Sequence, residues 1–404
     1  MISQKLRDDF PLLQKHPDLI YLDSASTSLK PAEVIEEQNR YYEELGSNTG
    51  RGSHHLSQKA TEEYENSREE VAKFIRSENS EIVFTRNATE SINLAAVGLE
   101  RMGHFSAGDE IVISQLEHHA NLIPWQQLCK RAGLKFKQVK LNSDYTLDMD
   151  DLEQKITKKT KLVSIAHVAN TVGTISPAAQ IAKIAHEKGA LFFLDSCQSI
   201  PHMEVDIKKI DADFCAFSAH KMLGPTGIGA LYGRKEILDK MPPYNFGGGM
   251  ISKVEFEKTQ FAAPPSKFEA GTAPIAQAFG FAQSCRYLRK VGMENIHDHE
   301  TKLTEQAIQK MSEIEGIKLH CPQDAKKQGA IALFDPVSID AVDFGVALDE
   351  SANIAIRTGM HCAEPLVSSI NPKGLCRASF YLYNSRAEID TFCEQVMAIC
   401  SSFK

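Results

Sequence analysis

The sequence has no long hydrophobic run and no excess of positive charge. No apolar stretch approaches the roughly 20 residues that a membrane-spanning helix requires, and the first residues, MISQKLRDDFPLLQKH, hold no apolar core of signal-peptide length. The 53 acidic residues outnumber the 45 lysines and arginines, and the resulting net charge of −8 argues against nucleic acid or an anionic membrane as the main partner. We therefore expect a cytoplasmic protein with neither kind of partner.

The cysteines also lack the spacing of a disulfide framework or a metal site. None forms a C-x-x-C pair and the count is odd, so we expect reduced thiols in a reducing compartment and no metal site. The nine positions are 129, 197, 215, 285, 321, 362, 376, 393 and 400. What the chain does have is 404 residues, 42% of them hydrophobic, which suffices for a large domain and a smaller one.

Short apolar runs alternate with helical patterns through the middle of the chain. A typical helical pattern is SPAAQIAKIAHEKGA (176–190), which ends at a glycine stop. The runs expected to be buried strands are EIVFT (81–85), EIVIS (110–114), KLVSIAHV (161–168), LFFLD (191–195), DFCAFS (213–218) and GALYG (229–233). This alternation predicts an α/β fold with a mostly parallel sheet covered by helices. Residues 273–314 are predicted to be helical, and IKLH, GAIALFD, NIAIRTG and CRASFYLY then predict a smaller α+β domain.

The stretch SAHKMLGPTGIGALYG (218–233) joins a lysine to a glycine-rich loop, but it fits neither nucleotide motif. In a P-loop the lysine follows the loop, whereas Lys221 precedes Gly224, Gly227 and Gly229. A dinucleotide fingerprint reads G-x-G-x-x-G, whereas this order is G-x-x-G-x-G and leads into a strand. Taken alone, Lys221 would be interpreted as a solvated lysine beside a tight turn.

Five predicted strands end in polar residues. The first is followed by Asn87 and Glu90, a capping pattern that would turn the backbone N–H groups of Ala88 and Thr89 outward at a positive helix end. The other four ends carry His118 with His119, Asn170, Asp195 with Gln198, and Ser218 with His220 and Lys221. Ligands of open α/β sheets bind at the carboxyl ends of the strands, so we expect these side chains to converge. The capped helix start and Asp195 can each also be interpreted as ordinary helix caps.

Pyridoxal 5′-phosphate is the ligand that such a set would bind. The helix start, Ser218 and His220 would hold the phosphate, and a carboxylate such as Asp195 would keep the pyridine nitrogen protonated. Gln198 would hydrogen-bond the 3′-oxygen, and an imidazole would stack on the ring. Lys221 would then be the covalent anchor that forms the Schiff base.

Seven motifs in order resemble those of the SUF-type (group II) cysteine desulfurases. They are YLDSASTSLKP, TRNATESINLAA, LEHHANLIPWQ, LDSCQSIPH, SAHKMLGPTGIGALYG, FEAGTAP and RTGMHCAEPL. This group lies within the class V aminotransferases and the fold-type I pyridoxal-phosphate enzymes. The resemblance implies a large cofactor-binding domain (20–275), a small domain (1–19 and 276–404) and a homodimer. It also implies that sulfur removed from L-cysteine, leaving L-alanine, is held as a persulfide for an acceptor protein in iron–sulfur cluster assembly.

The resemblance further implies a role for each matching residue. The Schiff-base lysine falls on Lys221 and the pyridine-nitrogen aspartate on Asp195. The ring-stacking histidine falls on His118, which is also expected to shuttle protons in catalysis. The remaining cofactor contacts fall on Gln198 and Asn170 for the 3′-oxygen, on Ala88, Thr89, Ser218 and His220 for the phosphate, and on Thr272, which would reach the phosphate from the other subunit. Arg377 matches the arginine for the substrate carboxylate, and Arg357 an arginine near the thiol; both are expected to contact the substrate, as is Asn170. Cys362 matches the nucleophilic cysteine.

Cys362 stands out from the other thiols by its surroundings. It lies between RTG and EPLV, a polar stretch bounded by glycine and proline that predicts an exposed loop. Arg357 and His361 are close in sequence and would favour its thiolate, while an adjacent histidine is badly placed to serve a Cys–His hydrolase. The chain departs from many relatives at Met360, where they have a second histidine, but other members tolerate different residues there.

Three alternatives remain open at this stage. One is another class V enzyme, such as an aminotransferase or a kynureninase-like lyase, which would have no use for Cys362 in its loop. The second is a selenocysteine lyase acting on L-selenocysteine, because selenium leaves from the same intermediate. The third is a non-enzymatic scaffold that merely carries a persulfide, which would have no use for Lys221, Asp195 and His118.

Overall fold

The large body of the protein is built on a seven-stranded sheet. The structure is a computed structural model that describes residues 4–322 and 324–402. The strands lie in the order β2 (Ile82–Thr85), β8 (Gly229–Gly233), β7 (Phe214–Ser218), β6 (Leu191–Asp195), β5 (Thr160–Ala166), β3 (Glu110–Ser114) and β4 (Lys135–Val139). β8 runs antiparallel to both of its neighbours, and the other neighbouring pairs of this sheet are parallel. The predicted α/β fold is confirmed.

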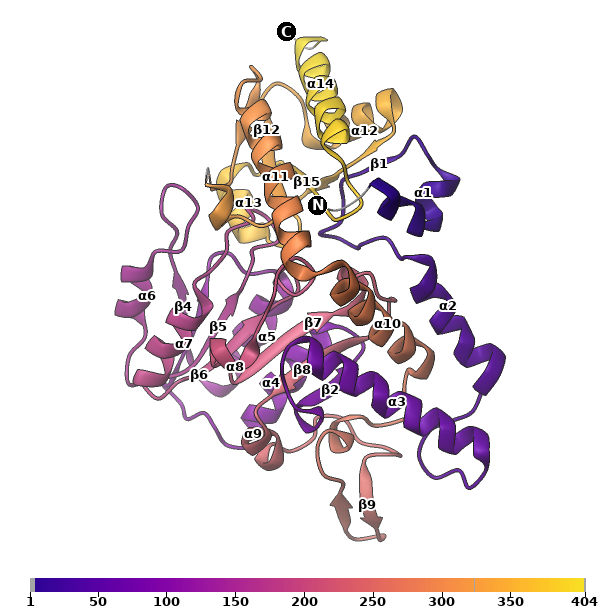
Figure 1. The fold of residues 1–404 in the computed structure, drawn as a ribbon. Coiled ribbons are helices and arrows are strands. Elements are labelled where there is room, and N and C mark those ends of the chain that lie inside the picture. The colour runs from indigo at the N-terminus through magenta and orange to yellow at the C-terminus, as the bar shows by residue number, and fades with distance from the viewer. Residues whose placement is uncertain (1–3, 323, 403–404) are drawn as a thin grey trace.

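Both faces of this sheet are covered by helices. Because successive side chains of a strand point to opposite sides, neighbouring residues belong to two different cores. Val112 and Phe192 belong to the core with helices α3 (His55–Phe74), α7 (Ala178–Glu187) and α10 (Ile275–Val291). Their neighbours Ile111 and Phe193 belong to the core with α4 (Ala88–Arg101) and α5 (His119–Ala132). Figure 1 shows helices on either side of the sheet.

A smaller body stands above the first in Figure 1 and holds a second sheet. Its strands pair antiparallel in the order β11 (Ile317–Leu319), β12 (Ile331–Pro336), β15 (Leu375–Ser379) and β14 (Arg357–Gly359). They share a core with α11 (Met293–Ser312), α12 (Ala341–Ala352) and α14 (Arg386–Ser402). The predicted helical region 273–314 forms two helices, α10 and α11. They are separated at Gly292, whose φ of +91° a glycine adopts readily.

The N-terminal segment packs against the C-terminal part of the chain. β1 (Ile20–Tyr21) pairs in parallel with β13 (Ile354–Ala355), and Ile20 and Leu22 are buried in the core of the small body. In contrast, α10 contributes Phe279, Phe281 and other side chains to the core of the large body. The predicted boundary at residue 275 thus falls at the start of α10, a helix that packs on one face of the large sheet. The division into two domains stays a prediction.

The remaining elements lie at the periphery. The short helices are α1 (Pro11–Lys15), α2 (Ala32–Arg40), α6 (Met149–Lys155), α8 (Ile207–Ile210), α9 (Lys235–Lys240) and α13 (Glu364–Ile370). A hairpin of β9 (Ile251–Val254) and β10 (Thr259–Phe261) projects from the large body at the bottom of Figure 1. Among the described helices, none combines the length and the apolar character that crossing a membrane requires.

Candidate active site

A cavity of about 260 Å³ lies where the carboxyl ends of the large sheet face the small sheet. The predicted site residues that line it are Ala88, Thr89, His118, Asn170, Asp195, Gln198, Ser218, His220, Lys221, Arg357, Cys362 and Arg377. The topology explains this convergence, because the first nine follow strand ends at one edge of the sheet. Thr272 is not among the described residues that line the cavity; it is exposed on a loop of the large body.

Lys221 is held at the cavity by a tightly packed loop. It closes a short 3₁₀ turn, Ala219–Lys221, directly after β7, and the chain then turns back into β8. A Cβ on Gly224 would lie 2.9 Å from the Ala219 carbonyl oxygen, so this close approach excludes larger side chains. The lysine therefore leaves a rigid hairpin between two buried strands.

The start of α4 forms an anion-suited corner of the cavity. Asn87 caps the helix by accepting the N–H of Glu90 at 3.0 Å, and the N–H of Ala88 donates to Ser218 Oγ at 2.9 Å. The reciprocal bond of a capping box is shifted by one residue, since the Glu90 carboxylate accepts from the N–H of Arg86. Backbone N–H groups at a helix N-terminus beside a hydroxyl are well suited to a phosphate.

Two buried amide oxygens in the cavity wall lack a hydrogen-bond partner among the described residues. Gln198 donates through Nε2 to the Ala25 carbonyl at 2.7 Å, which leaves its Oε1 unsatisfied. Asn170 donates through Nδ2 to the His361 carbonyl at 2.8 Å, which leaves its Oδ1 unsatisfied. Both atoms are buried hydrogen-bond acceptors, so a ligand hydroxyl group can satisfy them by donating. These amides lie in one cavity with Lys221, with Asp195, which is 5% exposed, and with the start of α4. This set of residues fits the predicted pyridoxal phosphate.

The two cavity histidines on the large body are held neutral. His118 caps α5 by accepting the N–H of Ala120 at Nδ1, 3.0 Å away. Burial, aided by the positive charge of Lys221, lowers the pKa of His118 to about 3. Burial, together with Lys221 and Lys30, lowers the pKa of His220 to about 4. At neutral pH both imidazoles are uncharged, which suits His118 to stacking on a ring.

The thiol of Cys362 enters the site from a strained loop between β14 and α13. His361 and Cys362 have φ angles of +50° and +54°, which non-glycine residues rarely adopt. The loop is fixed by Asn170 at the His361 carbonyl, and His361 Nε2 bonds the Leu375 carbonyl at 2.9 Å. Of the nine cysteines, Cys362 is the exposed one, Cys197 is half-buried and the others are buried.

Arg377 and Arg357 lie opposite each other on the paired strands β15 and β14. Arg377 is 2% exposed and donates through Nη1 to the Asn170 carbonyl and through Nη2 to Ser26 and Asp23. Burial lowers the pKa of Arg377, and Asp23 opposes that shift. Its Nε has no partner among the described residues, so one buried donor is left for a ligand.

Sequence reasoning assigned no role to three residues of the N-terminal segment that help to build the site. Ala25 and Ser26 line the cavity, and Lys30 Nζ donates to the His220 carbonyl at 3.0 Å. Burial lowers the pKa of Lys30 to about 8. All three lie in the motif YLDSASTSLKP, whose run of small polar residues after a short strand was the available signal.

This fold and this site define a class V aminotransferase, and the chain belongs to that family, which it matches over residues 20–392. Within the family, relatives that it matches over nearly their whole length include cysteine desulfurases. The Haloferax volcanii cysteine desulfurase is 43% identical, over 97% of this chain and 96% of the relative. The structure of cysteine desulfurase from Thermococcus onnurineus NA1 superposes with a TM-score of 0.95 at 40% identity, covering 100% of this chain and 99% of that one. The cysteine desulfurase CsdA from Escherichia coli gives a TM-score of 0.92 at 32% identity, with both chains fully covered.

Proposed function

We propose that this protein is a pyridoxal-phosphate-dependent cysteine desulfurase that holds the sulfur as a persulfide on Cys362. The observation that carries the proposal is the placement of the one exposed thiol, on a strained loop, in the same cavity as Lys221 and the buried Asp195. The names of the full-length relatives support the same activity. An aminotransferase or a kynureninase-like lyase would not need such a thiol.

Pyridoxal 5′-phosphate is the cofactor that the cavity residues would hold. Lys221 would bind it covalently, Asp195 would keep its pyridine nitrogen protonated, and the neutral ring of His118 would stack on it. When bound, the cofactor supplies a sink for the electron pair left at the substrate Cα. Two further parts of the cofactor would be contacted. Its phosphate would be bound by Ala88, Thr89, Ser218 and His220, and its ring oxygen by the side-chain amides of Gln198 and Asn170.

The chain's own residues would carry the substrate and move its protons and sulfur. Arg377 and Arg357 would hold the carboxylate of L-cysteine, with Arg377 Nε as the unpartnered donor. Lys221 would take the proton from Cα. The Cys362 thiolate would then attack the substrate sulfur, so that an S–S bond forms and the C–S bond breaks. The electron pair of the C–S bond stays on Cβ, which takes up a proton, and Lys221 returns a proton to Cα, so that L-alanine forms and no outside oxidant is needed.

We also propose that two copies of the chain form the working enzyme and that a sulfur-acceptor protein of iron–sulfur cluster assembly receives the sulfur. Thr272 is exposed next to Gly271, whose N–H donates to the Gly248 carbonyl at the base of the projecting hairpin. The hairpin tip exposes the apolar side chains of Val254 and Phe256. In a homodimer this loop could bring Thr272 to the partner's phosphate site, and the exposure of Cys362 leaves its sulfur open to an acceptor.

Replacing the thiol separates its work from that of the cofactor. Cys362→Ala should keep the visible absorption of the bound cofactor but lose nearly all sulfide release from L-cysteine, because nothing remains to attack the sulfur. Release of selenium from L-selenocysteine should survive better, since selenium leaves more readily. Cys393→Ala, which removes a buried thiol from the core of the small body, is the matched control and should retain activity. Unchanged cysteine turnover in Cys362→Ala would refute the persulfide role.

Removing the anchor tests the cofactor assignment. Lys221→Ala should keep the far-UV spectrum of the fold, lose the covalently bound cofactor and lose all turnover. A Lys221→Ala variant with full desulfurase activity would exclude this lysine both as anchor and as base.

A further inference from the structure

His119 connects the cofactor side of the cavity to the loop of the reactive thiol. It is the first residue of α5, directly after His118. Its backbone N–H donates to the Cys362 carbonyl at 2.7 Å, and its ring Nε2 accepts the N–H of Glu364 at 3.0 Å. One residue of the large body therefore holds the chain on both sides of Ala363.

The loop needs such an external contact because its own residues cannot supply one. Glu364 begins α13, and the N-cap of this helix is Ala363, which has no side chain that can accept a backbone N–H. Just before it, His361 and Cys362 both stay in the left-handed region of backbone space. The imidazole of His119 thus accepts the N–H of the first residue of α13, which has no acceptor within the helix, at a site where the backbone is strained.

The other described anchors of this loop act one residue earlier. Asn170 bonds the His361 carbonyl, and the His361 ring bonds the Leu375 carbonyl. Neither reaches Glu364, so the direction of the chain that leaves Cys362 is set by His119 and by the hydrogen bond of the Ala363 N–H to the Met360 carbonyl. The position of the thiol relative to the cavity depends on that direction.

We propose that His119 is a positioning residue for the sulfur step, holding the Cys362 loop in the geometry from which the thiol attacks. This inference rests on the proposed function, because it presumes that Cys362 is the nucleophile. The side chain of His119 is half-buried, and besides its bond to Glu364 its ring contacts that of His118, with the two ring centroids 6.3 Å apart. The backbone bond from His119 to Cys362 does not require the imidazole. A substitution therefore removes the bond to Glu364 and the contact with the His118 ring, and the cofactor absorption and selenium release report any effect of that second loss.

The test compares His119→Ala with His119→Gln in the holoenzyme. The Gln side chain can place an amide oxygen where Nε2 lies, so His119→Gln should restore the acceptor. His119→Ala should lower kcat for sulfide release from L-cysteine by about 10- to 100-fold, because small displacements of a reacting group have effects of that size. Release of selenium from L-selenocysteine and the visible absorption of the cofactor should change by less than about twofold, since neither needs the thiol in place. His104→Ala, which removes a half-buried imidazole bonded to the Lys161 carbonyl far from the cavity, is the matched control.

A second readout does not depend on turnover. Hydrogen exchange of the Glu364 amide should be faster in His119→Ala than in the unmodified protein and should return to its original rate in His119→Gln. In a Cys362→Ala background, His119→Ala should add no further loss of sulfide release, as expected for two residues that act on one step.

The possible failures are distinguishable. If Cys362→Ala retains full sulfide release, the proposed function and this inference both fall. If Cys362→Ala is inactive but His119→Ala keeps wild-type sulfide release, only the positioning role is overturned. It is also overturned if His119→Ala lowers sulfur and selenium release equally, or if His119→Gln does not rescue it, because the residue then acts on the cofactor or the fold.

Discussion

Arg377 of the small sheet donates from Nη1 to the main-chain oxygen of Asn170, 2.8 Å away at the end of the large sheet. Asn170 in turn holds the His361 carbonyl next to the thiol. The guanidinium thereby links three parts of the site, since its Nη2 also bonds Ser26. Only a planar fork can reach these acceptors at once and still present Nε to the cavity.

Arg377→Lys should therefore raise the KM for L-cysteine by about tenfold or more while lowering kcat less, because a lysine cannot keep these bonds and also bind the carboxylate. Steady-state kinetics and a melting temperature measured on the same preparation check this. An unchanged KM together with a lower melting temperature would show that Arg377 serves the fold rather than the substrate.

Asp195→Ala should retain some pyridoxal phosphate but lose most activity, because an unprotonated pyridine is a poor electron sink. Cofactor content by absorbance and turnover with L-cysteine are the two measurements. The carboxylate also accepts the N–H of Cys197 at 3.0 Å, an ordinary local cap. If turnover stayed within about twofold, that capping bond would be its whole role.

The buried pair of Arg68 and Glu269 should matter for stability. Arg68 is 1% exposed and donates to Glu269 at 2.5 and 2.9 Å, and Glu269 also accepts the N–H of Phe84. Glu269→Ala leaves the guanidinium buried with only Glu65 as a charged partner, so the free energy of unfolding should fall by about 3 kcal/mol or more.

Urea unfolding measures that loss. The surface pair of Lys235 and Asp239 is the comparison, because Asp239→Ala should change the free energy of unfolding by less than about 0.5 kcal/mol. Equal losses for the two variants would contradict the prediction.

Stability should fall as the pH drops below about 6.5, the ordinary pKa of histidine. Burial lowers the pKa of His118 to about 3 and those of His167 and His320 to about 4. Between these values and 6.5 the unfolded chain binds protons that the folded chain does not, so acid favours unfolding. The same cause acts on His220 and His361.

Two buried carboxyls work in the opposite direction. Burial raises the pKa of Glu117 and of Glu300 to about 7, so the folded chain keeps protons that the unfolded chain releases as the pH rises from about 4.3 to 7. Five histidines outweigh two carboxyls, and the melting temperature should therefore fall from pH 6.5 to pH 5. His320→Gln should make that fall shallower, whereas a melting temperature that stays flat or rises over this range would contradict the dominance of the histidines.

The part of the site at the strand ends was predictable because local patterns mark those ends. EIVIS, LFFLD and GALYG have the same bounds as β3, β6 and β8. Because β3, β6 and β7 run in one direction, their carboxyl ends meet at one edge of the sheet, whereas β8 runs the other way. The approach of His118, Asp195 and Lys221 to one another follows from this topology.

What could not be predicted depends on contacts between distant segments. NIAIRTG was expected to be one strand, but it is split at Ile356 because β13 pairs with the N-terminal β1 while β14 pairs with β15. β4 was missed because KFKQV lies at the sheet edge with polar side chains exposed. The bond between His119 and Glu364 spans 245 residues, and no local pattern signals it.

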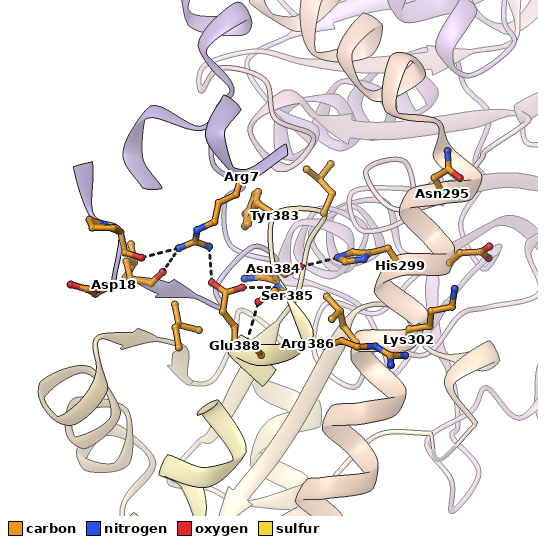
Figure 2. Close-up of a pocket in the computed structure, with 17 residues that line it drawn as sticks. Arg7, Asp18, Asn295, His299, Lys302, Tyr383, Asn384, Ser385, Arg386 and Glu388 are labelled. Atoms are coloured by element: carbon orange, nitrogen blue, oxygen red, sulfur yellow. Dashed lines mark hydrogen bonds and ion pairs between the residues drawn. The ribbon is translucent and has the colours of Figure 1, made fainter. Parts of the chain in front are cut away.

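A larger cavity of the described structure, about 840 Å³, shows that volume alone does not identify the functional site. Figure 2 shows Arg7, Glu388 and Ser385 joined by hydrogen bonds on one side of it and His299 bonded to Asn384 on the other. The polar groups of these residues are thus already paired with each other. None of the catalytic residues proposed above lines this cavity. The smaller cavity has the unsatisfied amides and the exposed thiol, and it is the one suited to chemistry.

The pairing of the first strand with the last third of the chain governs the order in which the protein can mature. The N–H of Ala25 bonds Ser379 Oγ, 354 residues further along the chain, and Ala25 itself lines the cavity. During synthesis, β1 therefore stays unpaired until its partner β13 has left the ribosome, when most of the polypeptide has been made. The seven-stranded sheet can assemble before that moment, but the wall of the cavity formed by Ala25 and Ser26 closes last. Such long-range closure slows folding and leaves an unpaired strand exposed in the meantime.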